Sequence, residues 1–513
     1  MPHLNPVEDV CDLLCEGLSE NRFTFLNEAT TLDRIDWNSR YVSHLWNYHF
    51  HYFDFLLCCR SDARARAELE RLVTSWIDEA KVGKSDGWDA YPISLRLVNW
   101  IYAFARMREH ISRPFAAKWQ AGIRVQAEFL SAHLEFQLLA NHLVKNLKAL
   151  IVAGLFLSRK DLLEQGESLL WRELAEQVLE DGGHYERAPM YHAQVLADFV
   201  ECYGLLKAFN RLNADQDALL SLKLRKMASF LQAMSYADGT LALFNDSANT
   251  AATRPRPILA SVDAVVSHEE TRSVSFPHTG YFTWAAPDSS EKIIVDAGPP
   301  AAEYNMAHAH CDMLSYELFL DGGPFVVDAG VHGYDGDPFR EYCRSTRAHN
   351  TAVFEGKEQS EVWGTFRMAR RARILEANAG GCNGGWKFEG RYAPYFDRDL
   401  VHSRRIERKE NGDWIITDSV AKGPVQAQSY VHLHPSVVVQ KTGENRVECE
   451  RDDHRSVIET FGCQQAEVIE DVYFPDFGVT QPSKTIVLKA SVNAAQEFGY
   501  RIWSTATDRR IPN

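Results

Sequence analysis

The sequence lacks a long hydrophobic run and a recognisable export signal. The apolar run at residues 151–157 (IVAGLFL) is far too short to cross a bilayer. The N-terminal stretch MPHLNPVEDVCDLLCEGL has no basic segment, no long apolar segment and no small-residue cleavage site. We therefore expect no transmembrane segment and no signal peptide. The chain as it stands is expected to be cytoplasmic, or periplasmic if an export sequence is missing from it.

Paired cysteines and excess positive charge are also missing. The ten cysteines include no CxxC pair, which excludes a zinc ribbon and a thioredoxin motif. In a chain of 513 residues this scatter is typical of reduced, buried thiols rather than a disulfide framework. The formal net charge of −15 argues against general affinity for nucleic acid.

An anionic ligand would therefore need a local basic patch. The second half of the chain offers a group of arginines, for which a solvated, charged strand face is the simpler interpretation: Arg344, Arg347, Arg367, Arg370, Arg371 and Arg373.

The first half of the chain has helical periodicity. A chain of this length is expected to form two or three domains. Apolar residues recur at helical spacing between about residues 40 and 235, for example Leu143, Leu147 and Leu150. Further helices are expected in 161–180, 190–212 and 215–235. No fixed-period repeat is evident, so a multi-helix toroid is favoured over an ordinary α-solenoid.

The second half has the pattern of a β-sandwich. The segment FNDSANTAATRPRPI, near residue 250, is rich in Asn, Ser, Thr and Pro, which indicates a linker or loop. Beyond it, short β-branched and aromatic runs such as YFTWAA, KIIVDAG and WIITDSV alternate with turn residues. We therefore predict an α+β multidomain protein, with a helical domain over 1–265 and an antiparallel β-sandwich over 266–513.

The strongest chemical motif is HAHCD, which holds His308, His310 and Asp312. If 308–312 is extended, all three side chains lie on one face of a strand. Together with Asp328 and His349 they could surround a divalent ion, with zinc favoured by the nitrogen ligands. The simpler alternative is a pair of hydrogen-bonded histidines on a sheet surface. A metallo-β-lactamase-type site is disfavoured, because Met follows the motif and no alternating βα pattern surrounds it.

Two further clusters lie in the helical half. NHLVKN contains Asn141, His142 and Asn146, and an Asn near a helix start needs no role beyond capping. DGGHYERAPMYH contains Tyr185 and Tyr191 in a polar loop that leads into a helix. Its ionisable and phenolic side chains exceed what a simple connection requires, which leaves a binding surface and an ordinary loop as open alternatives.

Aromatic residues are plentiful between residues 46 and 100. Aromatic faces stack on sugar rings, and Arg binds carboxylates through two parallel hydrogen bonds. Most of these side chains are expected in the core. We expect a minority to line a groove, namely Tyr48, His51, Trp88 and Arg96.

In this order, the motifs resemble the heparinase II/III-like polysaccharide lyases. The matching segments are NHLVKN, GGHYERAPMYH, FNDS, HAHCDMLSYELFLDGGPFVVDAG and RSTRAHNTAVFEGKEQSE. The resemblance covers about residues 44–440 and is most specific over 306–361. FTFLN and LWNYHFHYFD are similar to the subgroup found among bacterial surface-polysaccharide genes. The resemblance implies an incomplete (α/α) toroid followed by an antiparallel β-sandwich, in agreement with the division above.

The resemblance also implies β-elimination of a uronic-acid-containing acidic polysaccharide. Neutralising the uronate carboxylate stabilises the enolate-like intermediate, a base removes the C5 proton, and an acid protonates the departing O4. By resemblance, Asn141 contacts the carboxylate and His142 assists. Tyr191 is the acid, and also the base when both protons lie on one side. His308 is the base for the opposite epimer. Tyr185 competes with Tyr191 as the acid.

Further roles follow from the same resemblance. His310, Asp328 and His349 match zinc positions at which the metal is mainly structural. Arg347 is a candidate for binding a neighbouring acidic sugar, and Asn146 is a second candidate for the carboxylate contact. Tyr334 or Tyr342 could supply a second phenol.

Two alternatives stay open: a non-catalytic or biosynthetic glycan-binding protein on the same fold, and a zinc-dependent hydrolase. No organic cofactor is implied. The sequence leaves open the polysaccharide, the endo or exo mode and the oligomeric state.

Overall fold

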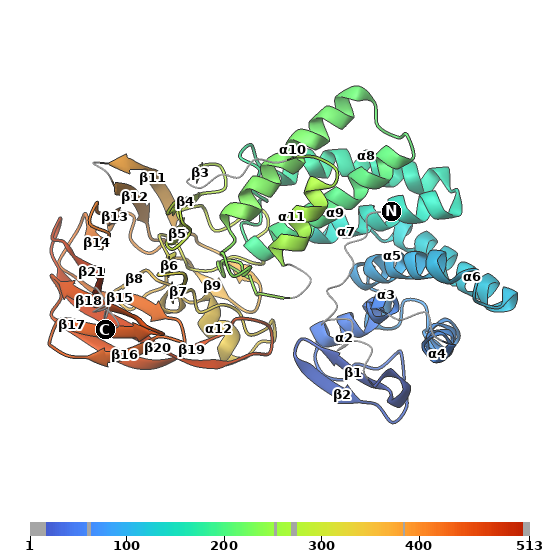
Figure 1. Ribbon diagram of the computed structural model, residues 1–513, viewed down its shortest axis with the longest axis horizontal. Coiled ribbons are helices and arrows are strands. Elements are labelled where there is room, and N and C mark those ends of the chain that lie inside the picture. Colours follow the sequence, from blue (N-terminus) through green and yellow to red (C-terminus); the bar gives the residue numbers. More distant parts are fainter. Residues whose placement is uncertain (1–16, 59–62, 251–253, 268–273, 383–384, 506–513) are drawn as a thin grey trace, which may run out of the picture.

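The computed structural model describes residues 17–505, except 59–62, 251–253, 268–273 and 383–384. Helices make up the first half and antiparallel strands the second (Figure 1). A β-hairpin, β1 (Arg22–Phe25) and β2 (Glu28–Thr31), precedes the helices. The helices are α2 (His44–Tyr52), α3 (Phe55–Cys58), α4 (Ala63–Glu79), α5 (Ala90–Met107), α6 (Arg113–Ala132), α7 (Ala140–Leu157), α8 (Lys160–Gln177), α9 (Pro189–Ala208), α10 (Ala214–Ala233) and α11 (Pro255–Asp263).

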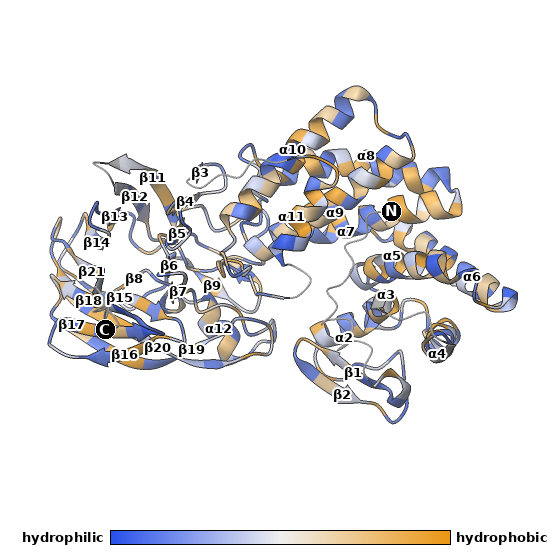
Figure 2. Cartoon of the chain, viewed as in Figure 1, coloured by the Kyte–Doolittle hydropathy of each residue, from blue (hydrophilic) through white to orange (hydrophobic). Residues whose placement is uncertain are grey.

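The predicted helices are confirmed, with one interruption. The helical spacing expected from about residue 40 onward is interrupted between α2 and α3, because Phe53 adopts a left-handed conformation with φ 60°. Helix α10 begins with a capping box between Asn213 and Gln216, which satisfies two backbone N–H groups. In Figure 2, hydrophobic and hydrophilic residues alternate around the helices, as expected for elements that bury one face.

Helix α7 is the central helix of the first half. Leu143, Leu147 and Leu150 are fully buried, as their spacing predicts. Among the described residues, α7 alone is long and apolar enough to cross a membrane by length and composition, yet 67% of it is buried inside the protein. The helix therefore has the character of a core helix, and it carries Asn141 and His142 on its first turn.

Two large antiparallel sheets form the second half. The first has the order β11-β12-β13-β14-β21-β18-β17-β16 and the second β19-β20-β15-β7-β6-β5-β4-β3, with β8 also pairing with β15. The strands of the first sheet are β11 (Arg373–Cys382), β12 (Gly385–Ala393), β13 (His402–Arg408), β14 (Trp414–Val420), β16 (Val438–Lys441), β17 (Arg446–Arg451), β18 (His454–Phe461) and β21 (Phe498–Thr505). Those of the second are β3 (Val274–Phe276), β4 (Tyr281–Ala285), β5 (Lys292–Asp296), β6 (Tyr316–Leu320), β7 (Gly323–Val326), β8 (Ala352–Phe354), β15 (Val425–Leu433), β19 (Gln465–Tyr473) and β20 (Gln481–Val492).

Buried apolar residues from both sheets form one core, among them Phe388 and Trp414 from the first sheet and Val431 and Leu488 from the second. Two smaller elements lie beside this core: helix α12 (Pro338–Arg344) and the short pair β9 (Val362–Trp363) and β10 (Arg367–Met368). The predicted fold class, helices followed by antiparallel sheets, is confirmed.

A buried ion pair holds the loops of the β half in place. Arg404 on β13 donates to Asp418 on β14 at 2.7 and 2.8 Å, and both side chains are fully buried. The same guanidinium donates to the backbone carbonyls of Leu314 and Asn350. Because these loops carry the HAHCD motif and His349, the sheet fixes the positions of both.

The segment expected to be a linker or loop includes a buried loop. Asn245, Asp246 and Ser247 are at most 1% exposed, and α11 follows them. Asn245 accepts a hydrogen bond from the backbone N–H of His310, which attaches this loop to the HAHCD motif. Of the two alternatives, linker or loop, the structure therefore has a loop at these residues, with polar side chains that are hydrogen-bonded inside the protein rather than solvated.

Candidate active site

The main sequence motifs meet between the two halves. Tyr191, on the first turn of α9, stacks on His308 of the loop between β5 and β6, with ring centroids 3.9 Å apart. Asn141 Nδ2 donates to both carboxylate oxygens of Glu186, at 3.2 and 3.1 Å. Glu186 Oε1 in turn lies 3.6 Å from His308 Nε2. Side chains from the helices and from the β half thus form one continuous cluster.

Two glycines allow the loop that carries Glu186 to reach the β half. Gly182 has φ +94°, a backbone conformation that favours glycine. A Cβ on Gly183 would lie 1.9 Å from Thr279 Oγ1, so only glycine fits there. Asp181 accepts hydrogen bonds from the hydroxyl and backbone N–H of Thr279. The DGG sequence therefore attaches the loop to the strand region and directs Glu186 toward Asn141.

Asp246 determines which nitrogen of His308 is free. Its oxygens lie 2.8 Å from His308 Nδ1 and from His310 Nε2, and Arg340 donates to both. Burial favours the neutral carboxyl, but Arg340 and the two imidazoles hold the pKa of Asp246 well below its usual range. An ionised Asp246 requires a proton on His308 Nδ1, which leaves a lone pair on Nε2. His308 can therefore accept a proton on the side that faces Glu186.

Tyr191 is suited to donate a proton. Its hydroxyl is 2.7 Å from the hydroxyl of Tyr334. Burial above all, together with Tyr334 and the charge of Asp246, raises the pKa of Tyr191 well above its usual value. The phenol is therefore neutral and can act as an acid. The competing Tyr185 instead contacts Tyr304, with ring centroids 6.0 Å apart, so the geometry favours Tyr191.

His142 and Asn146 are connected through Glu135. His142 Nδ1 lies 3.0 Å from Glu135 Oε1, and its partly exposed ring contacts Tyr91 with centroids 4.4 Å apart. Asn146 is fully buried, donates to Glu135 Oε2 at 2.9 Å and to Ser94 at 3.0 Å, and accepts from the Glu135 N–H. The expectation that Asn146 contacts a substrate carboxylate is therefore wrong, because its amide is used inside the protein.

Most of the predicted aromatic groove is core. His51 and Arg96 are fully buried, and Trp88 is 5% exposed. Arg96 donates to two backbone carbonyls and lies over the ring of Trp76, 4.0 Å from its centroid. The expectation that these three residues line a groove is wrong, because their side chains are buried in the helical half. Tyr48 is partly exposed and stays a candidate.

The HAHCD motif is not a strand. Residues 308–312 are irregular, so the expectation that they are extended is wrong. His308 and His310 still converge, because both bind Asp246. His349 Nδ1 lies 2.7 Å from Asp328 Oδ2, and the rings of His310 and His349 are 5.3 Å apart.

Two nitrogens in this cluster have properties expected of metal ligands. His310 Nδ1 and His349 Nε2 are buried and have no hydrogen-bond partner. Burial raises the pKa of the neighbouring Asp312 to about 6. Against the effect of burial, the charge of Asp328 raises the pKa of His349, and a metal ion would displace that proton. The donor chemistry therefore fits a divalent cation such as zinc.

The ligand atoms of His310, Asp328 and His349 lie farther from one another than in a metal site that is ready to bind an ion. Among the described residues, only His44, Asp86 and Asp89 bring three ligand atoms within 4.8 Å of one another. There, Asp86 already pairs with Arg40 at 2.7 Å, which opposes binding of a cation. His310, Asp328 and His349 would have to draw together around an ion.

Two arginines of the predicted basic patch, Arg344 and Arg370, are already engaged. Arg344 is buried and donates to backbone carbonyls, including that of Ala309. Arg370 pairs with Glu361 at 2.9 Å. Arg347 is exposed and lies over the ring of Tyr342, 5.1 Å from its centroid. Arg347 stays a candidate for contact with an acidic sugar, because its exposed guanidinium lies beside an aromatic ring.

Three residues of the cluster escaped the sequence analysis: Glu186, Asp246 and Arg340. Glu186 lies within the GGHYER segment and Asp246 within FNDS. Both segments were recognised as motifs, but no role was predicted for these two residues. Arg340 lies on the short helix α12, 94 residues from its partner Asp246, and no local pattern indicates that pairing.

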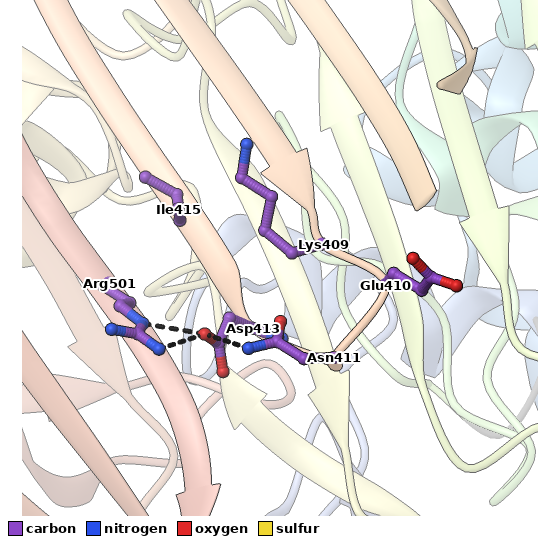
Figure 3. A pocket seen from close by; sticks show the side chains of 6 residues that line it. All are labelled: Lys409, Glu410, Asn411, Asp413, Ile415 and Arg501. Carbon is purple, nitrogen blue, oxygen red and sulfur yellow. Dashed lines mark hydrogen bonds and ion pairs between the residues drawn. The ribbon is translucent and has the colours of Figure 1, made fainter. Parts of the chain in front are cut away.

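A surface hollow elsewhere has no chemistry of this kind. It lies at the turn between β13 and β14 and is lined by Lys409, Glu410, Asn411, Asp413, Ile415 and Arg501 (Figure 3). Arg501 donates to Asp413 at 2.8 Å, so the charges there are already paired. None of the predicted site residues lines this hollow.

Comparisons with known proteins point to one family. The chain matches the heparinase II/III N-terminus model over residues 27–269 and the heparinase II/III-like C-terminal model over 268–501. The heparin-sulfate lyase of Pedobacter heparinus is 27% identical over 259 residues, 45% of this chain and 38% of that protein. The heparin-sulfate lyase of Bacteroides thetaiotaomicron is 24% identical over 347 residues, 55% and 48% of the two chains. The matches thus span less than half the length of these relatives.

The fold has a close counterpart among solved structures. A crystal structure of heparinase III superposes with a TM-score of 0.79 at 17% identity, covering 99% of this chain and 86% of that chain. At this identity the likeness shows the fold, and it agrees with a helical toroid followed by a β-sandwich. Because the two family models together span residues 27–501, the chain belongs to the heparinase II/III-like family.

Proposed function

We propose that the protein is a polysaccharide lyase that cleaves a uronic-acid-containing acidic polysaccharide by β-elimination. The observation that carries this proposal is the stacking of Tyr191 on His308 at 3.9 Å, beside Asn141. A neutral phenol and an imidazole with a free nitrogen are the acid and base that elimination needs, and they come from opposite halves of the protein. The relatives that are heparin-sulfate lyases support the same reaction class.

Each side chain has one role in the proposed reaction. His308 Nε2 accepts the C5 proton, and the Tyr191 hydroxyl donates a proton to the departing O4. Asn141 contacts the uronate carboxylate, so that charge developing on it is stabilised in the transition state. His142, held through Glu135, lies on the same turn of α7 and assists this contact. The C5–H and C4–O4 bonds break without water, and a C4–C5 double bond forms in the product.

A zinc ion forms part of the proposal as a structural element. His310, Asp328 and His349 would hold it, and the partnerless nitrogens of the two histidines support this assignment. When bound, zinc would draw together the loops around residues 310, 328 and 349. These loops would then hold in place the part of the β half that carries His308.

The test is incubation with a panel of uronate polysaccharides, including heparan sulfate, alginate and bacterial exopolysaccharides. A lyase produces the ultraviolet absorbance of the unsaturated uronate. A glycan-binding protein would bind a member of the panel without producing that absorbance. A zinc hydrolase would release reducing ends without it, and chelation would abolish the release. No absorbance and no new ends on any member would refute the proposal.

A further inference from the structure

Glu186 is a buried carboxyl group in the middle of the candidate site. It is 2% exposed, and its oxygens contact Asn141 from α7, His184 from its own loop and His308 from the β half. In the part of the chain that the structure describes, no Lys or Arg pairs with it. Its neighbour Arg187 donates to the backbone carbonyls of Thr279, Tyr185 and His278. An ionised Glu186 would therefore be a buried charge without a cationic partner, which is costly.

The hydrogen bonds of Gln177 determine the tautomer of His184. Gln177 Nε2 donates to Ala140 O at 3.1 Å and to Glu173 Oε2 at 2.8 Å, so both amide hydrogens face acceptors. The amide oxygen must therefore be the atom 2.9 Å from His184 Nε2, and Nε2 must carry the hydrogen. His184 Nδ1 is left with a lone pair. It is buried, has no hydrogen-bond partner, and lies 3.5 Å from Glu186 Oε2.

The contact between Glu186 and His184 Nδ1 requires one proton. If Glu186 were a carboxylate, an anionic oxygen would face the lone pair of His184 Nδ1 with no hydrogen between them. Burial, together with the charges that His192, His308 and Arg187 can carry, holds the pKa of His184 well below its usual range, so the imidazole does not supply the proton. A proton on Glu186 satisfies the orphaned nitrogen and removes the unpaired charge.

We propose that Glu186 is a neutral carboxylic acid whose hydroxyl faces Nδ1 of His184, and that this uncharged carboxyl adjoins Asn141 in the subsite for the uronate carboxylate. The second part rests on the proposed function, whereas the first does not. A carboxylate at position 186 would repel an anionic sugar from Asn141. A carboxylic acid adds no charge, so it lets the uronate approach the amide.

Glu135 provides a matched control, because it is also a buried carboxyl beside a histidine. It is 5% exposed. Its Oε1 is 3.0 Å from His142 Nδ1 and its Oε2 accepts from Asn146 at 2.9 Å. Unlike His184, His142 has no second partner among the described residues that fixes its tautomer, so a hydrogen on Nδ1 can face Oε1 and no orphaned lone pair faces Glu135. Glu135 therefore needs no proton of its own, and we expect it to be a carboxylate.

Infrared difference spectroscopy tests the protonation directly in the full chain at neutral pH. Subtracting the spectrum of Glu186→Gln from that of the wild type should reveal the C=O stretch of a protonated carboxylic acid. The Glu135→Gln difference should instead show carboxylate bands. Carboxylate bands in the Glu186→Gln difference would overturn the proposal. This readout needs no turnover, so it is independent of whether the protein is a lyase.

A second measurement keeps the proposal testable if Glu186→Gln fails to fold. In wild-type protein labelled with ¹⁵N-histidine, His184 should have one protonated and one unprotonated ring nitrogen. Two protonated nitrogens would place the proton on His184 and overturn the assignment.

The role in the subsite is tested by kinetics on whichever uronate polysaccharide is cleaved. Glu186→Gln should raise KM by no more than about threefold, because the amide can still donate to His184. Glu186→Ala should raise KM about tenfold or more, because it leaves Asn141 and His184 unpaired. Equal effects of the two substitutions would refute the subsite role, while absence of cleavage by the wild type would refute the lyase proposal instead.

Discussion

Replacing Tyr191 by Phe removes one oxygen atom from the centre of the site. The hydroxyl makes a hydrogen bond to Tyr334 at 2.7 Å, while the ring packs on His308, Met190 and Phe477. Because only the hydrogen bond is lost, the free energy of unfolding should fall by about 1 kcal/mol. Loss of the general acid should lower kcat by about 10²- to 10⁴-fold, equivalent to about 3–5 kcal/mol in the activation free energy.

Tyr334→Phe is the matched control for this prediction. It breaks the same hydrogen bond but keeps the phenol at position 191, so stability should fall equally while kcat falls by about tenfold or less. The assays are urea unfolding and the rate of ultraviolet absorbance on a cleaved uronate polysaccharide. If Tyr191→Phe keeps kcat within tenfold of the wild type, Tyr191 is not the acid. If Tyr334→Phe is the inactive variant, the acid is the second phenol.

Three further predictions concern the metal, the core and acid stability. His310→Ala should lower the bound zinc measured by elemental analysis and lower the melting temperature, and equal zinc content in variant and wild type would contradict the metal assignment. Arg96→Leu should destabilise the fold without raising KM, because Arg96 is fully buried; a raised KM with an unchanged melting temperature would show that it contacts substrate after all. Although burial favours the neutral form, Arg404 holds the pKa of Asp418 well below its usual range, so this carboxylate stabilises the fold above about pH 4, and the stabilisation is lost as the pH falls further. Urea unfolding against pH should therefore show a shallower acid loss for Asp418→Asn than for the wild type.

Local patterns predicted the elements because periodicity reflects which face is buried. Helix α7 runs over Ala140–Leu157, and Leu143 and Leu147 are buried as their spacing requires. Residue type alone could not distinguish a groove from a core. Arg96 lies among aromatic residues that suit sugar binding, yet it donates to backbone carbonyls inside the helical half.

Site residues that belong to a recognisable sequence motif were predicted. Site residues that are held by contacts between distant parts of the chain were missed. His308 and Tyr191 belong to recognisable motifs, and the structure brings them together. Asp246 binds His308 across 62 residues and Arg340 across 94, and such pairings leave no spacing signal in the chain. The same contacts explain why 308–312 is irregular, since both imidazoles turn toward one carboxylate rather than following a strand.

Mass spectrometry of the cleavage products distinguishes elimination from hydrolysis. If Tyr191 and His308 catalyse elimination, cutting a defined uronate oligosaccharide yields two fragments whose masses sum to that of the intact chain, one of them bearing the double bond. Fragments whose summed mass exceeds the intact chain by one water would show hydrolysis and contradict elimination at Tyr191 and His308.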